Sequence, residues 1–425
     1  MHEIKKLKNG LQYIYIPNSG TSAVTVLLLF PIGSRYETRP ISGISHFLEH
    51  MLFKGTKKRP DYLAISRELD AAGADYNAFT YKDYTGYYVK IGASMVGKAF
   101  DIISDISFNS TMPAKEVEKE KGVIVEELRM YEDSPMHAIE LVFDRLMFPN
   151  HPLGWDVGGN EKTVRAITRA QLLNYYHDHY SPQKAVLVVA GNLSKEDLEK
   201  NLEKFALATS KNPAEPKYLP FKFKDNLSLS ERVAVQPRKI DQVQMIMGFH
   251  GVAHSDKRSY AAAVLLTILG GGMSSRLFVE VREKRGLAYM VRAGSWPYRD
   301  VGSVYVQAGL DPKRLPAALR TIKVELKKIA TKAVSKKELA DAKTSLVGRM
   351  DLALEDSSVM AERAAKQFIF LGDALTAAEV ARRVNEVTAK DVLALAKELF
   401  KVKEMHLAVI GPVKKEDVLK MLKNK

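Results

Sequence analysis

His46 and His50 lie four residues apart in the segment His46-Phe-Leu-Glu49-His50. Side chains at this spacing share one face of a helix, so both imidazoles can reach one metal ion. Glu49 lies on that face too, within reach of a water on such a metal. The opposite face is apolar, since hydrophobic residues recur at helical spacing: Ile44, Phe47, Leu48, Met51 and Leu52. The segment therefore predicts a helix with one packing face and one chemical face.

A surface helix with solvated polar groups would show the same spacing, so a metal site needs a third ligand. A catalytic zinc site uses three protein ligands and keeps one position open for water. A second helix is predicted from Pro113, because proline suits the first helical turn. On it Glu120 and Glu127 share a face, in or beside an apolar stripe where an unpaired carboxylate is costly. Glu116, Glu118 and Glu126 are interpreted as solvated charges, but spacing alone does not separate Glu126 from Glu127.

The order His46-x-x-Glu49-His50 followed by Glu127 resembles the pitrilysin family of zinc peptidases, which includes insulin-degrading enzyme and the mitochondrial processing peptidases. Other family-like segments span nearly the whole chain: residues 50–56, 73–80, 132–135, 151–154, 180–192 and 269–289. The resemblance implies that His46, His50 and Glu127 bind zinc and that Glu49 is the general base on the zinc-bound water. It implies that Glu120 supports the site, and the seven-residue interval from Glu120 favours Glu127 over Glu126.

The same resemblance implies how a peptide would bind. Residues 73–80 are similar to the family's substrate-binding edge strand, which makes Asn77, Ala78 and Phe79 substrate-binding residues. Residues 269–289 resemble a substrate-clamping segment, in which Arg282 contacts the peptide backbone and Tyr289 donates its hydroxyl to the developing oxyanion. The alternative is a surface ion pair for Arg282 and half-buried packing for Tyr289.

The two halves of the chain are distant copies. Residues 86–100 match the pattern of 302–315, and 190–197 match 410–417. Each copy mixes alternating strands with amphipathic helices, which predicts an α+β fold. We expect two homologous domains, each a mostly antiparallel sheet packed with helices, that pair as half of a clamshell chamber. The boundaries are 1–211 for the zinc-binding domain, 212–235 for a proline-rich linker and 236–425 for the second domain.

The second copy lacks the metal-binding residues. When the repeats are aligned, Ala262, Leu265 and Leu266 correspond to His46, Glu49 and His50, and Ala342 and Arg349 correspond to Glu120 and Glu127. The sequence therefore predicts one zinc per chain, in the first half.

Composition limits the remaining possibilities. The chain has 425 residues and no cysteine, which excludes disulfides, thiol catalysis and cysteine metal sites. It shows no signal-peptide pattern and no apolar run near the ~20 residues of a membrane span, so we expect a cytoplasmic protein without membrane association. The net charge of +14 is scattered among glutamates without a nucleic-acid motif, which favours a solvated basic surface over nucleic-acid binding. Gly270–Gly272 lacks the ending of a phosphate loop, so nucleotide binding by this loop is rejected.

These observations together predict a zinc-dependent endopeptidase that cleaves extended peptides or unfolded segments. Longer members of the family carry four such domains in one chain, whereas this chain has two. The resemblance thus implies a homodimer, in which Arg282 and Tyr289 of one chain complete the zinc site of the other. The alternatives are a presequence-type processing peptidase and a non-catalytic scaffold subunit of the same family.

Overall fold

The computed structural model describes residues 2–208, 215–224 and 226–423. In these ranges helices pack against two mostly antiparallel sheets, which confirms the α+β class. The first sheet has the order β1-β2-β6-β3-β5-β4, from β1 (Glu3–Lys6), β2 (Gln12–Pro17), β3 (Ala23–Phe30), β4 (Asp75–Thr80), β5 (Thr85–Gly92) and β6 (Val186–Gly191). The second has the order β7-β11-β8-β10-β9, from β7 (Val233–Pro237), β8 (Val243–Gly251), β9 (Ala288–Pro297), β10 (Gly302–Leu310) and β11 (His406–Gly411).

The two sheets repeat one topology. The path β2-β6-β3-β5-β4 in the first sheet corresponds to β7-β11-β8-β10-β9 in the second. In each sheet the first pair of this path is parallel and the other pairs are antiparallel. The internal repeat predicted from the sequence is therefore confirmed, and β4 and β9 are equivalent edge strands.

Helices from both halves cover these sheets. The first half contributes α1 (Ile44–Leu52), α2 (Tyr62–Asp70), α3 (Val96–Phe108), α4 (Ala114–Asp133), α5 (Pro135–Met147), α6 (Glu161–Ala166), α7 (Arg169–His179) and α8 (Lys195–Ala206). The second contributes α9 (Ser259–Gly270), α10 (Leu315–Thr331), α11 (Lys336–Ala353), α12 (Ser357–Leu371), α13 (Ala377–Glu386), α14 (Ala389–Leu399) and α15 (Lys415–Lys423). No helix in the described ranges combines the length and the apolar character needed to cross a membrane.

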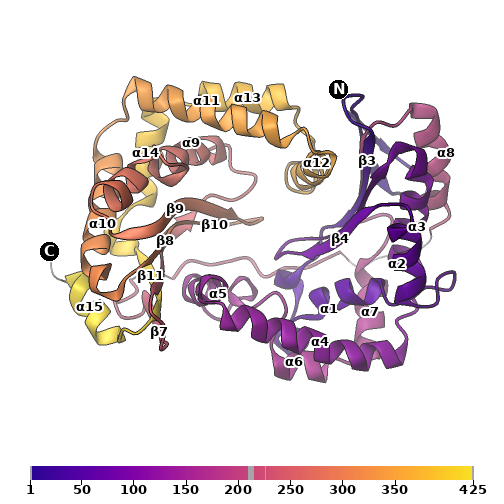
Figure 1. Cartoon of the computed structure of the whole chain (residues 1–425), viewed down its shortest axis with the longest axis horizontal. Coiled ribbons are helices and arrows are strands. Elements are labelled where there is room, and N and C mark those ends of the chain that lie inside the picture. The colour runs from indigo at the N-terminus through magenta and orange to yellow at the C-terminus, as the bar shows by residue number, and fades with distance from the viewer. Residues whose placement is uncertain (1, 209–214, 225, 424–425) are drawn as a thin grey trace. The chain divides into compact units, whose positions relative to one another are not determined.

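Packing divides the chain into two compact units built from discontinuous segments. The first unit comprises residues 1–129, 155–219 and 351–376, and the second comprises 130–154, 220–350 and 377–425. These units differ from the division at residues 211 and 236 that the sequence predicted, because one helix of each half of the chain packs on the sheet of the other half. Helix α5 packs on β8 and β11, and α12 packs on β3 and β6 (Figure 1). Residues 212–214 and 225 of the expected linker lie outside the described residues.

Apolar surface explains this exchange of helices. A sheet face rich in aliphatic side chains must be covered by another element to remove it from water. In the first unit the α12 alanines Ala361, Ala364 and Ala365 cover Leu27 and Leu29 of β3. In the second unit Ile139 and Phe143 of α5 cover strand residues of β8 and β11, namely Ile246, Ala408 and Ile410.

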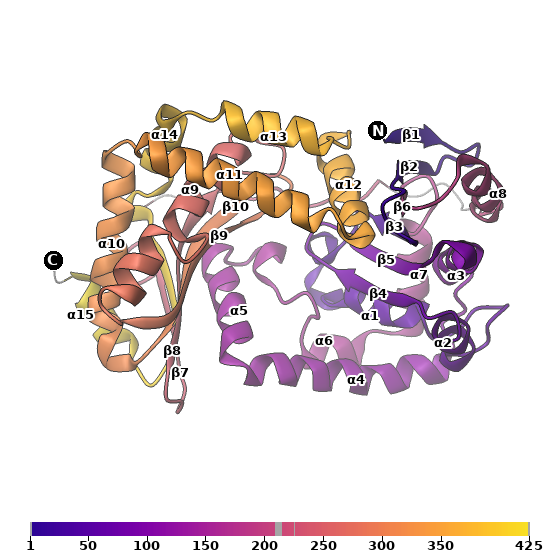
Figure 2. The same ribbon diagram turned by 45° about the horizontal axis from the view of Figure 1, so that its top comes forward.

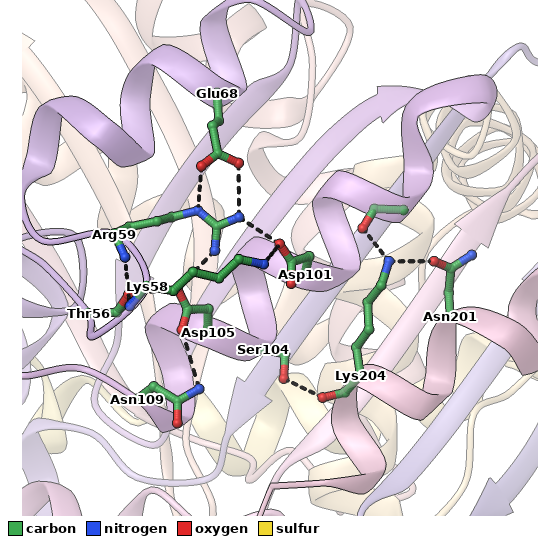
Figure 3. Close-up of polar contacts among 11 residues, drawn as sticks. Thr56, Lys58, Arg59, Glu68, Asp101, Ser104, Asp105, Asn109, Asn201 and Lys204 are labelled. Carbon is green, nitrogen blue, oxygen red and sulfur yellow. Dashed lines mark hydrogen bonds and ion pairs between the residues drawn. The ribbon is translucent and has the colours of Figure 1, made fainter.

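A buried charge network anchors the loop that follows α1 (Figure 3). The Arg59 side chain is only 2% exposed, and its guanidinium contacts Asp101 and Asp105 of α3 and Glu68 of α2 at 2.6–2.9 Å. The Thr56 hydroxyl donates to Asp105 over 2.7 Å. These contacts tie the loop after α1 to α2 and α3.

Candidate metal centre

Helix α1 carries its apolar residues inward as predicted. Ile44, Phe47, Leu48, Met51 and Leu52 are all buried in the core of the first unit. His46, Glu49 and His50 lie on the opposite side of α1, where they face residues of β4 and α4. Figure 2 shows helix α1 beside strand β4 and above helix α4.

A buried carboxylate holds the start of this helix. Gly43 precedes α1 with φ of 98°, a left-handed conformation that suits glycine, and provides no side-chain cap. Instead, the backbone N–H groups of Gly43 and Ser45 donate to the two oxygens of Glu37 over 2.7 and 2.9 Å. Glu37 thereby satisfies free donors that every helix N-terminus presents. Burial raises the pKa of Glu37 to about 7, against the opposing effect of these hydrogen bonds and of Lys82.

Three candidate metal ligands converge between α1 and α4. The Nε2 atoms of His46 and His50 are 3.3 Å apart, and Glu127 Oε2 lies 3.7 and 3.4 Å from them. Donors of a tetrahedral zinc with bonds of ~2.0–2.1 Å stand ~3.3–3.4 Å apart, so the triangle matches zinc in both donor type and size. Glu126 instead lies on the exposed side and pairs with Arg129 at 2.7 Å.

The orientation of His50 depends on Glu120. Glu120 Oε1 lies 2.9 Å from His50 Nδ1, and Oε2 lies 2.8 Å from Lys54 Nζ. A carboxylate can only accept here, so Nδ1 carries a proton and Nε2 is the nitrogen that faces the triangle. The hydrogen bond from His50 and the ion pair with Lys54 lower the pKa of Glu120 despite the opposing effect of burial.

The two histidines sit in different electrostatic surroundings. Burial, assisted by His50, lowers the pKa of His46 to about 4, so His46 is a neutral ligand at physiological pH. Burial also acts to lower the pKa of His50, but hydrogen bonds with Glu120 and Glu127 outweigh it and raise this pKa to about 9. Negative charge is thus concentrated on one side of the triangle, where a divalent cation would take the place of the His50 proton.

Glu49 is placed separately from the three donors. Its Oε2 accepts a hydrogen bond of 2.5 Å from the Thr80 hydroxyl at the end of β4. Burial raises the pKa of Glu49 to about 6, with the Thr80 hydrogen bond opposing the shift. A carboxylate with a pKa near neutrality is suited to accept and return a proton.

Strand β4 borders this centre and ends the first sheet. It pairs with β5 through Asn77↔Tyr88, Ala78↔Tyr87 and Phe79↔Gly86. In the described sheet no strand pairs with its other edge. Asn77 is exposed, whereas Ala78 and Phe79 are partly buried. An unpaired edge can accept an added strand through its backbone.

Arg282 and Tyr289 belong to the second unit. Arg282 lies in a short π-helical turn, η5 (Phe278–Glu283), and its guanidinium lies 4.9 Å from the ring centre of Tyr289. Tyr289 is the second residue of edge strand β9 and is 79% exposed. Half-buried packing of Tyr289, the alternative weighed from the sequence, is therefore wrong.

The repeat of this centre in the second unit has no metal-binding character. Ala262 of α9 and Ala342 of α11 are buried apolar residues. Arg349, aligned with Glu127, donates from Nη1 to the Gly271 carbonyl over 2.8 Å. Within residues 2–208, 215–224 and 226–423, one group of three His, Asp or Glu side chains is close enough to share a metal ion, namely His46, His50 and Glu127.

Three residues around the centre were not assigned a role from the sequence. Lys54 follows His50 by four positions, a spacing that points to the same side of a helix. Thr80 ends a segment that was expected to bind substrate, but nothing local connects it to Glu49. Glu37 shows no sequence signal, because its partners are backbone N–H groups of residues 43 and 45.

Comparisons with known proteins agree with this geometry. Residues 13–159 match the insulinase family (peptidase family M16), and residues 166–346 match the peptidase M16 inactive domain. An uncharacterized zinc protease of Streptomyces coelicolor is 35% identical over 96% of this chain and 89% of its own length. An uncharacterized zinc protease of Bacillus subtilis is 34% identical over 95% of this chain and 97% of its own.

A solved structure shares the fold. The crystal structure of a protease from Helicobacter pylori superimposes with a TM-score of 0.90 and 24% identity, over 97% of this chain and 99% of that one. The family resemblance drawn from the sequence is thus confirmed over nearly the whole chain. We conclude that this chain belongs to the insulinase family of peptidases, family M16.

Proposed function

We propose that this protein is a zinc-dependent endopeptidase, with one zinc held by His46, His50 and Glu127. The observation that carries the proposal is the triangle of two imidazole nitrogens and one carboxylate oxygen with edges of 3.3–3.7 Å. Two imidazoles and one carboxylate form a common donor set of catalytic zinc sites, and the fourth position remains for water. Both relatives are named as uncharacterized zinc proteases, and these names support the choice of metal.

The residues around the triangle divide the work of peptide hydrolysis. When bound, zinc supplies Lewis acidity that polarises a carbonyl and lowers the pKa of water. Glu49 accepts the proton of the attacking water and delivers it to the leaving amine. Thr80 holds the Glu49 carboxylate in one orientation through its 2.5 Å hydrogen bond. Glu120 orients His50 and keeps its Nε2 lone pair directed at the metal.

The substrate lies extended along β4, adding a strand to the first sheet at Asn77, Ala78 and Phe79. This mode of binding relies on backbone hydrogen bonds, so it tolerates many side chains and predicts broad sequence specificity. Arg282 holds the peptide backbone, and the exposed hydroxyl of Tyr289 donates to the oxyanion that develops at the scissile carbonyl.

The active enzyme is a homodimer in which Arg282 and Tyr289 act on the zinc site of the partner chain. Mixing Glu49→Gln protein with Tyr289→Phe protein should restore part of the activity, because a hybrid dimer contains one intact site. Absence of recovery after confirmed subunit exchange would contradict the shared site and leave the zinc assignment intact.

The direct test is hydrolysis of an unstructured peptide by wild-type protein and by Glu49→Gln, with bound zinc quantified in both. We expect cleavage by the wild type alone and equal zinc in the two proteins. Zinc without cleavage by either protein would favour the scaffold role. Absence of zinc from both would overturn the metal assignment.

A further inference from the structure

The second unit contains an open cavity of about 1070 Å³ that the proposed peptidase chemistry does not use. It lies where β8 ends and β11 begins, and the segment Phe221–Phe223 borders it. A volume of roughly 300–1,000 Å³ is typical of sites for small organic molecules. All residues that line it belong to the second unit, whereas His46, His50 and Glu127 belong to the first.

Aromatic rings form one side of this cavity. The imidazole of His250 lies 5.3 Å from the ring of Phe221 and 4.8 Å from that of Phe223, measured between ring centres. The His406 ring lies 5.5 Å from that of His250. Phe223 is 58% exposed, an unusual position for a phenylalanine beside other rings. A flat ligand can stack on this surface, and stacking would remove the Phe223 ring from water.

The two histidines are left with unsatisfied polar atoms. His406 is only 3% exposed, and neither its Nδ1 nor that of His250 has a hydrogen-bond partner among the described residues. Buried polar atoms are usually paired, because an unpaired one costs about 1–3 kcal/mol. Burial and Arg232 lower the pKa of His406 to about 4, although a hydrogen bond with the Glu404 backbone opposes this, so the ring is neutral.

Positive charge surrounds the opening. Among the residues that the structure describes, six basic side chains line the cavity against two acidic ones, Glu398 and Glu404. Glu398 is paired with Arg258 at 2.7 Å, and Glu404 with Lys401 at 3.6 Å. Lys222 and Lys403 form no ion pair within the described parts of the chain. Two free ammonium groups beside a ring surface are suited to an anion that is attached to an aromatic body.

We propose that this cavity is a binding site for a small aromatic anion, with a flat ring against Phe223 and His250 and a phosphate-like group near Lys222 and Lys403. None of the residues that line it belongs to the candidate metal centre. It is independent of the proposed peptidase activity.

The test measures binding of flavin mononucleotide and adenosine monophosphate to the whole chain by fluorescence titration and calorimetry. Riboflavin and inorganic phosphate serve as probes that each carry only one half of the chemistry. We expect at least one of the two nucleotides to bind saturably at one site per chain. It should bind about tenfold or more tightly than riboflavin, which lacks the charge-assisted phosphate contact, and than inorganic phosphate, which lacks a ring to stack.

Variants then locate the site. Lys222→Glu/Lys403→Glu and Phe223→Ala should each weaken nucleotide binding by about tenfold or more. All three residues are exposed, so the substitutions should leave folding and peptide hydrolysis unchanged. The matched control is Lys313→Glu/Lys327→Glu, which makes the same charge change at exposed positions that do not line the cavity. Failure of both nucleotides to bind saturably, or equal weakening by the control, would overturn the proposal.

Discussion

Replacing Glu120 by glutamine isolates the contribution of a residue that would not itself touch the metal. Glutamine keeps the size of the side chain but removes its charge. In the folded protein the Glu120 carboxylate is 2% exposed and contacts His50 Nδ1 at 2.9 Å and Lys54 Nζ at 2.8 Å. The substitution therefore turns a charge-assisted hydrogen bond to His50 into a neutral one and leaves the Lys54 ammonium without its partner.

The magnitude follows from these two contacts. A hydrogen bond to a charged group contributes about 1.5–3 kcal/mol and a neutral one about 0.5–1.5 kcal/mol, so about 1–1.5 kcal/mol of support for His50 is lost. Since about 1.4 kcal/mol is tenfold in affinity, the zinc Kd should rise about tenfold. The unpaired Lys54 charge acts in the same direction, and an upper bound of about 100-fold is typical for partners of metal-bound histidines.

Competition with a zinc chelator at fixed pH measures this change directly. The matched control is Glu118→Gln on the same helix, which removes the same charge from a side chain that is 70% exposed and pairs with Lys121. We expect the control to leave the zinc Kd within about twofold of the wild type, because exposed charges are screened by water and salt. Equal shifts for Glu118→Gln and Glu120→Gln would refute the reasoning, since the effect would then be one of net charge.

Three further predictions concern the surroundings of the centre. Thr80→Val should lower kcat about tenfold or more with KM and zinc content little changed, because it removes the hydrogen bond that orients the Glu49 carboxylate. Thr80→Ser keeps a hydroxyl and should retain most of the rate. A normal kcat for Thr80→Val in steady-state peptide hydrolysis would contradict this role. Arg59→Met should lower the unfolding free energy by about 3–5 kcal/mol, because it removes the buried guanidinium that pairs with Asp101 and Asp105. Lys58→Met, at a side chain that is 58% exposed, should lower it by about 1 kcal/mol or less. Urea titration of the two variants measures the difference. The folded-state pKa of Glu37, about 7 against 4.5 in an unfolded chain, means that the folded state prefers the neutral acid, so the stability that Glu37 contributes is largest below pH 4.5 and is lost as pH rises toward 7. The unfolding free energy of the wild type relative to Glu37→Gln should therefore fall by up to about 3 kcal/mol over that range, and a pH-independent difference in denaturant titrations would show that the burial effect is absent.

Much of the fold could be predicted because it rests on short-range patterns. The apolar residues of α1 recur at the spacing of a helical turn, which predicts both the helix and its inward face, and all five residues predicted to face inward are buried. The repeat at 86 and 302 was visible because β5 and β10 occupy the same position in the two sheets. The exchange of α5 and α12 was not visible, because an amphipathic helix shows which of its faces is apolar and not which sheet that face will cover.

The sequence by itself determined the two helical segments that build the candidate centre: two histidines one helical turn apart with a glutamate between them, and two glutamates on one face of a second helix. These relations are local, since backbone geometry along a helix depends on residues three or four positions away. Only the tertiary structure brought Glu127 rather than Glu126 to the two imidazoles, joined Thr80 to Glu49, and set Glu37 against the start of α1. Those contacts depend on how separate elements pack, and packing is decided by the burial of apolar surface over the whole unit rather than by any one segment.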